Sequence, residues 1–189
     1  MRLIHLIYQA ILILESMPIN SYANIYFKII ENKIHHLDLE GNNIGDRGVD
    51  IICNTLAGDS SVKYLNLSKN NITDKSAVYV GEMIYTNISI TALFLSWNEI
   101  KGEGGSTIAK ALHENTYIKV IDLSFNSLGS MHFQKRSCIK PLSDALKANK
   151  TLVHIDFSYV GFTHEDGAIL NQGLKYNHNI LGIHMTGNQ

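Results

Sequence analysis

One spacing of apolar residues recurs along most of this chain and limits the folds that it can adopt. The pattern is apolar-x-x-apolar-x-apolar-x-x-Asn-x-apolar, and its first copy consists of Ile34, Leu37, Leu39, Asn42 and Ile44. Further copies start at residues 62, 90, 118, 152 and 180, so the period is 28 residues and one repeat is lengthened to 34. A fixed period of this length indicates a solenoid, in which each unit packs on its neighbours and an extended surface results.

Each repeat predicts one strand and one helix. Around Leu37 and Leu39, apolar and polar residues alternate as in a short strand with one buried face. After the Asn, a turn containing glycine such as Gly104 precedes apolar residues at helical spacing, such as Ile108 and Leu112. The sequence therefore predicts an α/β fold, a right-handed solenoid or horseshoe of about 5.5 repeats with a parallel inner β-sheet and outer α-helices.

The ninth position of the pattern is asparagine in five of the six repeats: Asn42, Asn70, Asn98, Asn126 and Asn188. Stacked side-chain amides at this position can bond backbone groups of neighbouring turns that would otherwise be buried without partners. The fifth repeat has Val160 instead. We therefore expect the polar ladder to weaken at Val160.

These motifs resemble the ribonuclease-inhibitor-like class of leucine-rich repeat, the long type that also occurs in intracellular immune receptors and in the activator of the Ran GTPase. The resemblance covers residues 34–189. It implies the fold, whereas proteins of this class bind unrelated partners on one scaffold.

Composition and cysteine usage narrow the class of partner and the compartment. An apolar content of 45% and a net charge of −1 exclude an electrostatic nucleic-acid binder. The only cysteines, Cys53 and Cys138, have no spacing for a metal site or a disulfide cap. Secreted leucine-rich domains usually carry such caps, so we expect an intracellular, cytoplasmic protein. The four Asn-x-Ser/Thr sequons argue the other way: Asn66, Asn71, Asn87 and Asn149.

We expect both end repeats of the predicted solenoid to be covered by further residues. We expect residues 1–33 to form an N-terminal helical cap, although residues 3–14, too short to span a bilayer, could also be a signal sequence. In the sixth repeat, Ile180, Ile183 and Met185 have no following repeat. We expect a partner or missing chain to cover this edge.

Aromatic residues occupy the position just before the ladder Asn in three consecutive repeats: Trp97, Phe125 and Tyr159. In the predicted fold they line a rim of the concave sheet face, roughly 5 Å apart from strand to strand. Phe94 lies one strand position further in and would enlarge the patch. Aromatic side chains are common anchors of protein interfaces. The alternative is that the rings stack on one another and only shield the turns.

Charged residues add further candidates for partner binding. Asp122 and Asp156 face the concave strip and could steer a basic partner, or could be solvated strand residues. Lys135 and Arg136 belong to an insertion near residues 129–137 of the fourth repeat, which we expect to project from one face. No catalytic set, cofactor site or metal site can be assembled from the sequence.

The sequence thus predicts a non-catalytic scaffold for protein–protein interaction, a structural subunit or adaptor in a larger intracellular assembly. Residues 181–188 are similar to leucine-rich proteins of cytoskeletal complexes and of the ciliary axoneme. One alternative is a small-GTPase regulator of the Ran-activator type, although neither Arg47 nor Arg136 falls in a stretch that matches its catalytic loop. Another is the leucine-rich fragment of an immune receptor or effector.

Overall fold

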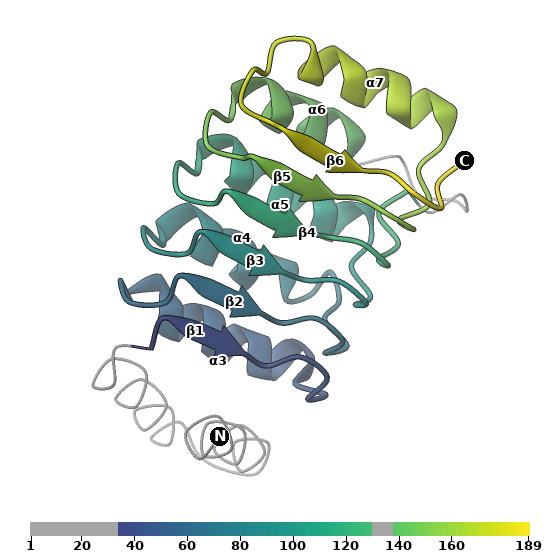
Figure 1. The fold of residues 1–189 in the computed structure, drawn as a ribbon. Coiled ribbons are helices and arrows are strands. Elements are labelled where there is room, and N and C mark those ends of the chain that lie inside the picture. The colour runs from purple at the N-terminus through teal and green to yellow at the C-terminus, as the bar shows by residue number, and fades with distance from the viewer. Residues whose placement is uncertain (1–33, 130–137) are drawn as a thin grey trace.

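The computed structural model describes residues 34–129 and 138–189, which form one sheet and one layer of helices (Figure 1). The strands are β1 (His36–Asp38), β2 (Tyr64–Asn66), β3 (Ala92–Phe94), β4 (Val120–Asp122), β5 (His154–Asp156) and β6 (Gly182–His184). The helices are α3 (Gly45–Ala57), α4 (Ala77–Thr86), α5 (Gly102–Glu114), α6 (Ile139–Ala148) and α7 (His164–Leu174). The predicted N-terminal cap (residues 1–33) and most of the insertion, with Lys135 and Arg136, lie outside the described residues.

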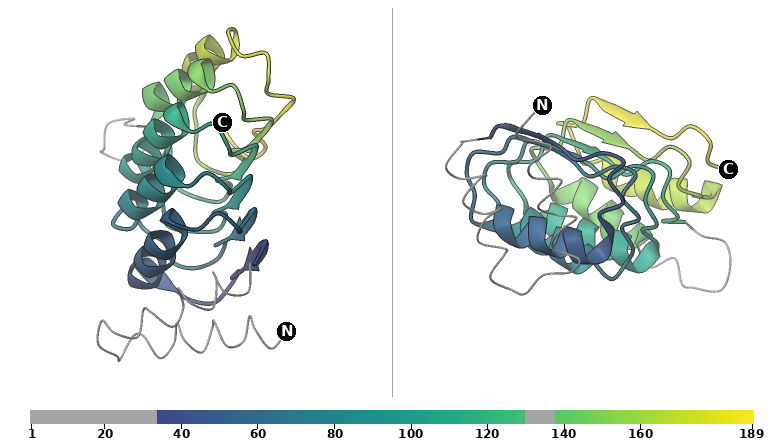
Figure 2. Two further views of the ribbon diagram at one scale, coloured as in Figure 1. Left: turned by 90° about the vertical axis from the view of Figure 1, so that its left-hand side faces the viewer. Right: turned by 90° about the horizontal axis from the view of Figure 1, so that it is seen from below.

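The six described strands form one parallel sheet in chain order, and helices α3 to α7 lie on the same side of it (Figure 2). Equivalent residues of successive repeats pair in register, for example Leu37 with Leu65 and Leu65 with Leu93. These central strand residues are at most 1% exposed. Burying each such side chain contributes about 1.5–3 kcal/mol. The observed architecture confirms the predicted α/β solenoid with an inner parallel sheet and outer helices.

The helix layer corrects one detail of the prediction. Gly104 does not form the turn before the helix but is the third residue of α5. A Cβ atom added there would lie 2.9 Å from the Cβ atom of Ala77 in α4, closer than such atoms normally approach. The glycine therefore serves the close packing of two neighbouring helices, a requirement that only the assembled fold reveals.

The predicted asparagine ladder is present, and Asn98 shows how it works. Its Oδ1 atom accepts hydrogen bonds from the backbone N–H groups of Asn70 (2.9 Å) and Ile72 (3.1 Å) in the preceding repeat. Its Nδ2 atom donates to the carbonyl oxygens of Leu67 (3.1 Å) and Leu95 (2.9 Å). Nδ2 also donates to the carbonyl of Ser96 (3.3 Å), so one side chain of 8% exposure bonds five backbone groups in two repeats.

Val160 interrupts this ladder, as expected, because valine has no amide. Its side chain is 1% exposed and belongs to the apolar core. The backbone of repeat five approaches repeat four closely here: Gly129 N–H donates to the carbonyl of Val160 (2.9 Å), and a Cβ atom on Gly129 would lie 2.3 Å from the carbonyl oxygen of Gly161. Apolar packing occupies the place of the missing amide, while the backbone bond is retained, since the equivalent bond joins Gly45 N–H to the carbonyl of Asn70 (2.8 Å).

A second asparagine ladder runs along the opposite ends of the helices, and the sequence analysis missed it. It consists of Asn87, Asn115, Asn149 and Asn177. Asn149, for example, donates from Nδ2 to the carbonyls of Leu112 (2.7 Å) and Asn115 (2.9 Å). Asn87 and Asn149 were noted only as sequons, yet they are 3% and 2% exposed and their amide nitrogens already donate. They are structural residues rather than glycosylation sites in this fold.

Candidate partner-binding surface

The residue before each ladder position adopts the left-handed backbone conformation in all six repeats. The φ angles are 71° for Gly41, 56° for Lys69, 55° for Trp97, 52° for Phe125, 55° for Tyr159 and 75° for Gly187. This conformation costs a residue with a Cβ atom about 1–2 kcal/mol, a cost that glycine avoids. The turn between strand and ladder thus imposes one geometry, and three repeats place a bulky aromatic residue where glycine would be less strained.

These three aromatic rings stack in order along the rim; the name aromatic rim is used below for Trp97, Phe125 and Tyr159. The ring centroids of Trp97 and Phe125 are 4.1 Å apart with planes at 10°, and those of Phe125 and Tyr159 are 4.5 Å apart at 14°. A Cβ atom on Gly187 would lie 2.3 Å from the Tyr159 ring, so this ring covers the next rim position. The aromatic rim is therefore a continuous stack across neighbouring repeats.

Stacking does not remove the aromatic rim from solvent. Trp97 is 54% exposed and Tyr159 is 50% exposed, while Phe125 between them is half-buried. The rings therefore stack on one another, as the shielding interpretation expects, and still present a large apolar surface. Its role in partner binding stays a prediction.

A hollow of about 300 Å³ adjoins the N-terminal end of the aromatic rim. It is lined by Lys69, Asn71, Trp97, Asn98, Glu99 and Phe125. The Lys69 Nζ atom lies 2.7 Å from Oε1 of Glu40. The hydrogen bonds from Lys69 and Asn66 lower the pKa of the Glu40 carboxyl. Lys69 is thus an ion-pair partner of the preceding repeat.

Phe94 packs in an aromatic cluster of the concave strip, and its part in partner binding stays a prediction. Within the described residues its ring packs against Tyr64 (4.9 Å) and makes no ring contact with Trp97. Tyr64 in turn stacks on His36 with centroids 3.9 Å apart and planes at 7°. Burial raises the pKa of the Tyr64 hydroxyl, and the nearby carboxylate of Asp38 adds to this effect. The concave strip and the aromatic rim therefore carry two separate groups of aromatic residues.

The two acidic candidates lie side by side on β4 and β5 and are half-buried. Asp122 Oδ1 accepts a hydrogen bond from the backbone N–H of Ser124 (2.9 Å), and Asp156 Oδ1 accepts one from Ser158 (2.7 Å). Asp156 Oδ2 also lies 3.9 Å from Nδ1 of His184. Each carboxylate thus uses one oxygen to hold the turn after its strand. Steering of a partner by these residues stays a prediction.

The repeats were compared with known proteins. The family described as Leucine Rich repeat matches residues 32–53, 58–81 and 86–109. These three stretches of the chain are leucine-rich repeats. The fold of the chain is of the ribonuclease-inhibitor-like type, which confirms the resemblance seen in the sequence.

Two solved structures share this fold with little sequence identity. The first is the actin-binding site 2 of leiomodin-1, with a TM-score of 0.64 and 18% identity over 85% of this chain and 92% of that chain. The second is the tropomodulin C-terminal domain of Caenorhabditis elegans, with a TM-score of 0.66 and 13% identity over 86% and 94%. No curated protein matches the sequence.

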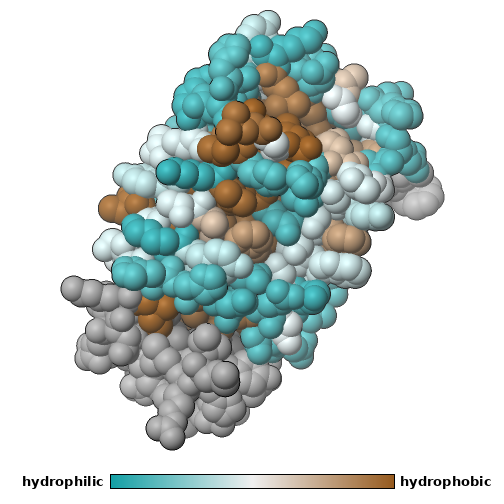
Figure 3. Space-filling model, viewed as in Figure 1, coloured by the Kyte–Doolittle hydropathy of each residue, from teal (hydrophilic) through white to brown (hydrophobic). Residues whose placement is uncertain are grey.

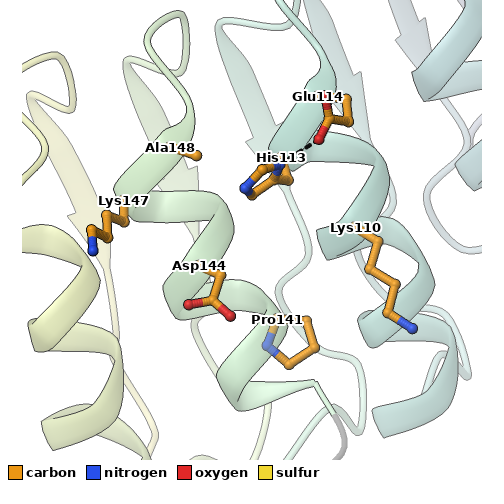
Figure 4. Close-up of a pocket in the computed structure, with 7 residues that line it drawn as sticks. All are labelled: Lys110, His113, Glu114, Pro141, Asp144, Lys147 and Ala148. Carbon is orange, nitrogen blue, oxygen red and sulfur yellow. Dashed lines mark hydrogen bonds and ion pairs between the residues drawn. The ribbon is translucent and has the colours of Figure 1, made fainter.

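The helix side of the molecule has a hollow of about 660 Å³ between α5 and α6 (Figure 4). Its lining residues are Lys110, His113, Glu114, Pro141, Asp144, Lys147 and Ala148. This lining carries charges of both signs, and His113 Nδ1 lies 2.7 Å from Oε1 of Glu114.

Across residues 34–129 and 138–189, no cluster of three or more His, Cys, Asp or Glu side chains is placed to ligate a metal ion. In the same residues no helix has the length and apolar character to cross a bilayer.

The strand face seen in Figure 3 has an apolar patch towards its β6 end. Leu181 is 85% exposed, and Ile180, Ile183 and Met185 of the sixth repeat are only partly buried against the core. These are the residues expected to need a cover. What covers them stays a prediction.

Proposed function

We propose that this protein is a non-catalytic scaffold that binds another protein along the aromatic rim. The observation that carries the proposal is the stack of Trp97, Phe125 and Tyr159, held in left-handed backbone and half exposed. Strained conformations persist where the surrounding structure enforces them, and they cluster at functional sites. A stack that is already ordered loses little side-chain entropy on binding, which suits it as an interface anchor.

The chemistry of the described residues supports a binding role over catalysis. The largest pKa shifts are those of Cys53 and Cys138, which burial raises, to about 12 for Cys138. Both side chains are at most 1% exposed. Neither can supply a thiolate nucleophile near neutral pH, because reactive cysteines need a lowered pKa and access to solvent.

We further propose that the partner belongs to the cytoskeleton and that actin is the first candidate. The support is the fold shared with the actin-binding site 2 of leiomodin-1. At 18% identity the likeness concerns the fold, so the binding residues come from this chain's own surface. Cytoplasmic location and ciliary placement rest on the sequence alone.

Affinity capture of the tagged protein, with chemical cross-linking and mass spectrometry, tests the scaffold, and cosedimentation with actin filaments tests the partner. The double variant Trp97→Ala/Phe125→Ala should lose about 2 kcal/mol or more of binding free energy, roughly a 30-fold loss of affinity. Its circular dichroism should stay close to that of the unmodified protein, and its urea midpoint should fall only modestly, because two stacking contacts of about 0.5–1.5 kcal/mol each are lost.

A matched control removes two exposed aromatic residues from the helix side instead. Tyr85 and Tyr176 are 66% and 60% exposed, in α4 and just after α7. The double variant Tyr85→Ala/Tyr176→Ala should bind as the unmodified protein does. Equal losses in both double variants, or unfolding of the rim variant, would contradict the proposal. Capture of only a small GTPase, in a nucleotide-dependent manner, would favour the Ran-activator alternative.

A further inference from the structure

The two faces of the Trp97 indole have different surroundings. One face stacks on Phe125 of the following repeat. The equivalent residue of the preceding repeat is Lys69, but its Nζ atom pairs with Glu40, and no cation lies over the Trp97 ring among the described residues. Lys69 and Trp97 both line the hollow of about 300 Å³. Phe125 also lines this hollow, and Trp97 is 54% exposed, so the hollow gives access to part of the indole beside the stack.

Two polar side chains of the same hollow have no partner. Glu99 and Asn71 are exposed, and neither side chain makes a hydrogen bond or ion pair with the described residues. Lys69, the one lysine of the lining, is engaged with Glu40 and makes no ion pair with Glu99. An exposed indole thus lines the same hollow as a carboxylate without an ion-pair partner and a free amide.

We propose that this hollow binds an arginine side chain of the partner protein. The planar guanidinium can lie against the exposed part of the Trp97 ring while its N–H groups donate to the carboxylate of Glu99 and the amide oxygen of Asn71. A lysine fits less well, since a compact, strongly hydrated ammonium cannot stack or donate in a fork. A volume of about 300 Å³ suits one side chain rather than a larger ligand. This inference rests on the proposed function and specifies the group that the rim recognises.

The only tryptophan of the chain lies in the site, so its indole N–H signal in NMR spectra reports on the hollow alone. N-acetyl-arginine amide is titrated against the protein, with N-acetyl-citrulline amide as the uncharged isostere. The arginine compound should shift the signal saturably and the citrulline compound should not. Glu99→Gln should weaken arginine binding at least about threefold, in line with an exposed ion pair. The control variant Glu82→Gln removes an exposed carboxylate of α4 and should leave arginine binding unchanged.

Three results would overturn the inference: no saturable shift with the arginine compound, an equal shift with citrulline, or full binding by Glu99→Gln. Partner capture separates this failure from failure of the proposed function. If partner capture depends on Trp97 but the arginine compound does not shift the indole signal, the arginine site is contradicted and the scaffold proposal is still supported. If the arginine compound shifts the indole signal but partner capture does not depend on Trp97, the hollow binds a guanidinium and the aromatic rim is not the partner surface.

Discussion

Two neighbouring positions in every repeat share one turn and have opposite roles. The ladder position is asparagine in five repeats, and in Asn70, Asn98 and Asn126 the side chain is at most 8% exposed. The rim position just before it keeps the same left-handed backbone while its side chain varies between glycine, lysine and three kinds of aromatic residue. The ladder side chain points at neighbouring turns and must satisfy them. The rim side chain points outward, so the fold leaves its identity open to other requirements.

The largest expected effect comes from removing a ladder amide. Asn98→Val should lower the free energy of unfolding by about 3 kcal/mol, because Asn70 N–H, Ile72 N–H and Leu67 C=O are left buried without this partner. Urea denaturation followed by circular dichroism measures it. A loss below about 1 kcal/mol would mean that the ladder contributes no more than an ordinary surface hydrogen bond.

The buried core also makes the free energy of unfolding depend on pH. The pKa of Cys138 is raised to about 12 from an ordinary value of 9.0, chiefly by burial. A thiol with a raised pKa contributes stability below pH 9 that is lost as the pH rises towards 12, since only the unfolded chain ionises readily. Between these limits the thiol contributes a slope of about 1.4 kcal/mol per pH unit. Cys138→Ala should remove that part of the alkaline slope in urea titrations at pH 9.5 to 11. An unchanged slope would indicate that the thiol ionises within the fold.

At Val160, where the asparagine ladder is interrupted, the reverse substitution can be made. Val160→Asn should change the free energy of unfolding by less than about 1 kcal/mol, because the new amide can offer ladder bonds while apolar burial at a 1% exposed position is lost. The same denaturation experiment compares it directly with Asn98→Val. A loss of more than about 2 kcal/mol would show that apolar packing at this repeat has replaced the ladder entirely.

The smallest effect is expected at the aromatic rim. Tyr159→Gly removes the left-handed strain of about 1–2 kcal/mol and loses a stacking contact of about 0.5–1.5 kcal/mol. These terms nearly cancel, so the urea midpoint should hardly move. A clear loss of stability would make the stack a structural element and weaken its interpretation as a binding surface.

Much of the fold could be predicted because the repeat period tells which residues become equivalent. The registers, the buried strand residues and the first asparagine ladder all follow from that equivalence. The second ladder had a comparable signal, since asparagine recurs at 87, 115, 149 and 177, but two of its members were interpreted as sequons. That the Phe94 ring packs against Tyr64 could not be predicted, because spacing along a strand does not say which neighbouring ring a side chain meets.

The sequence by itself determined the architecture of this protein, because side chains repeated at a constant spacing can bury one face only by stacking unit on unit. It also placed Trp97, Phe125 and Tyr159 at one position of successive repeats. The tertiary structure alone decided that this position is left-handed, that the three rings stack, that Lys69 pairs with Glu40, and that Trp97 stays 54% exposed. These features depend on contacts between repeats, and a linear pattern does not encode the direction in which a side chain leaves its turn.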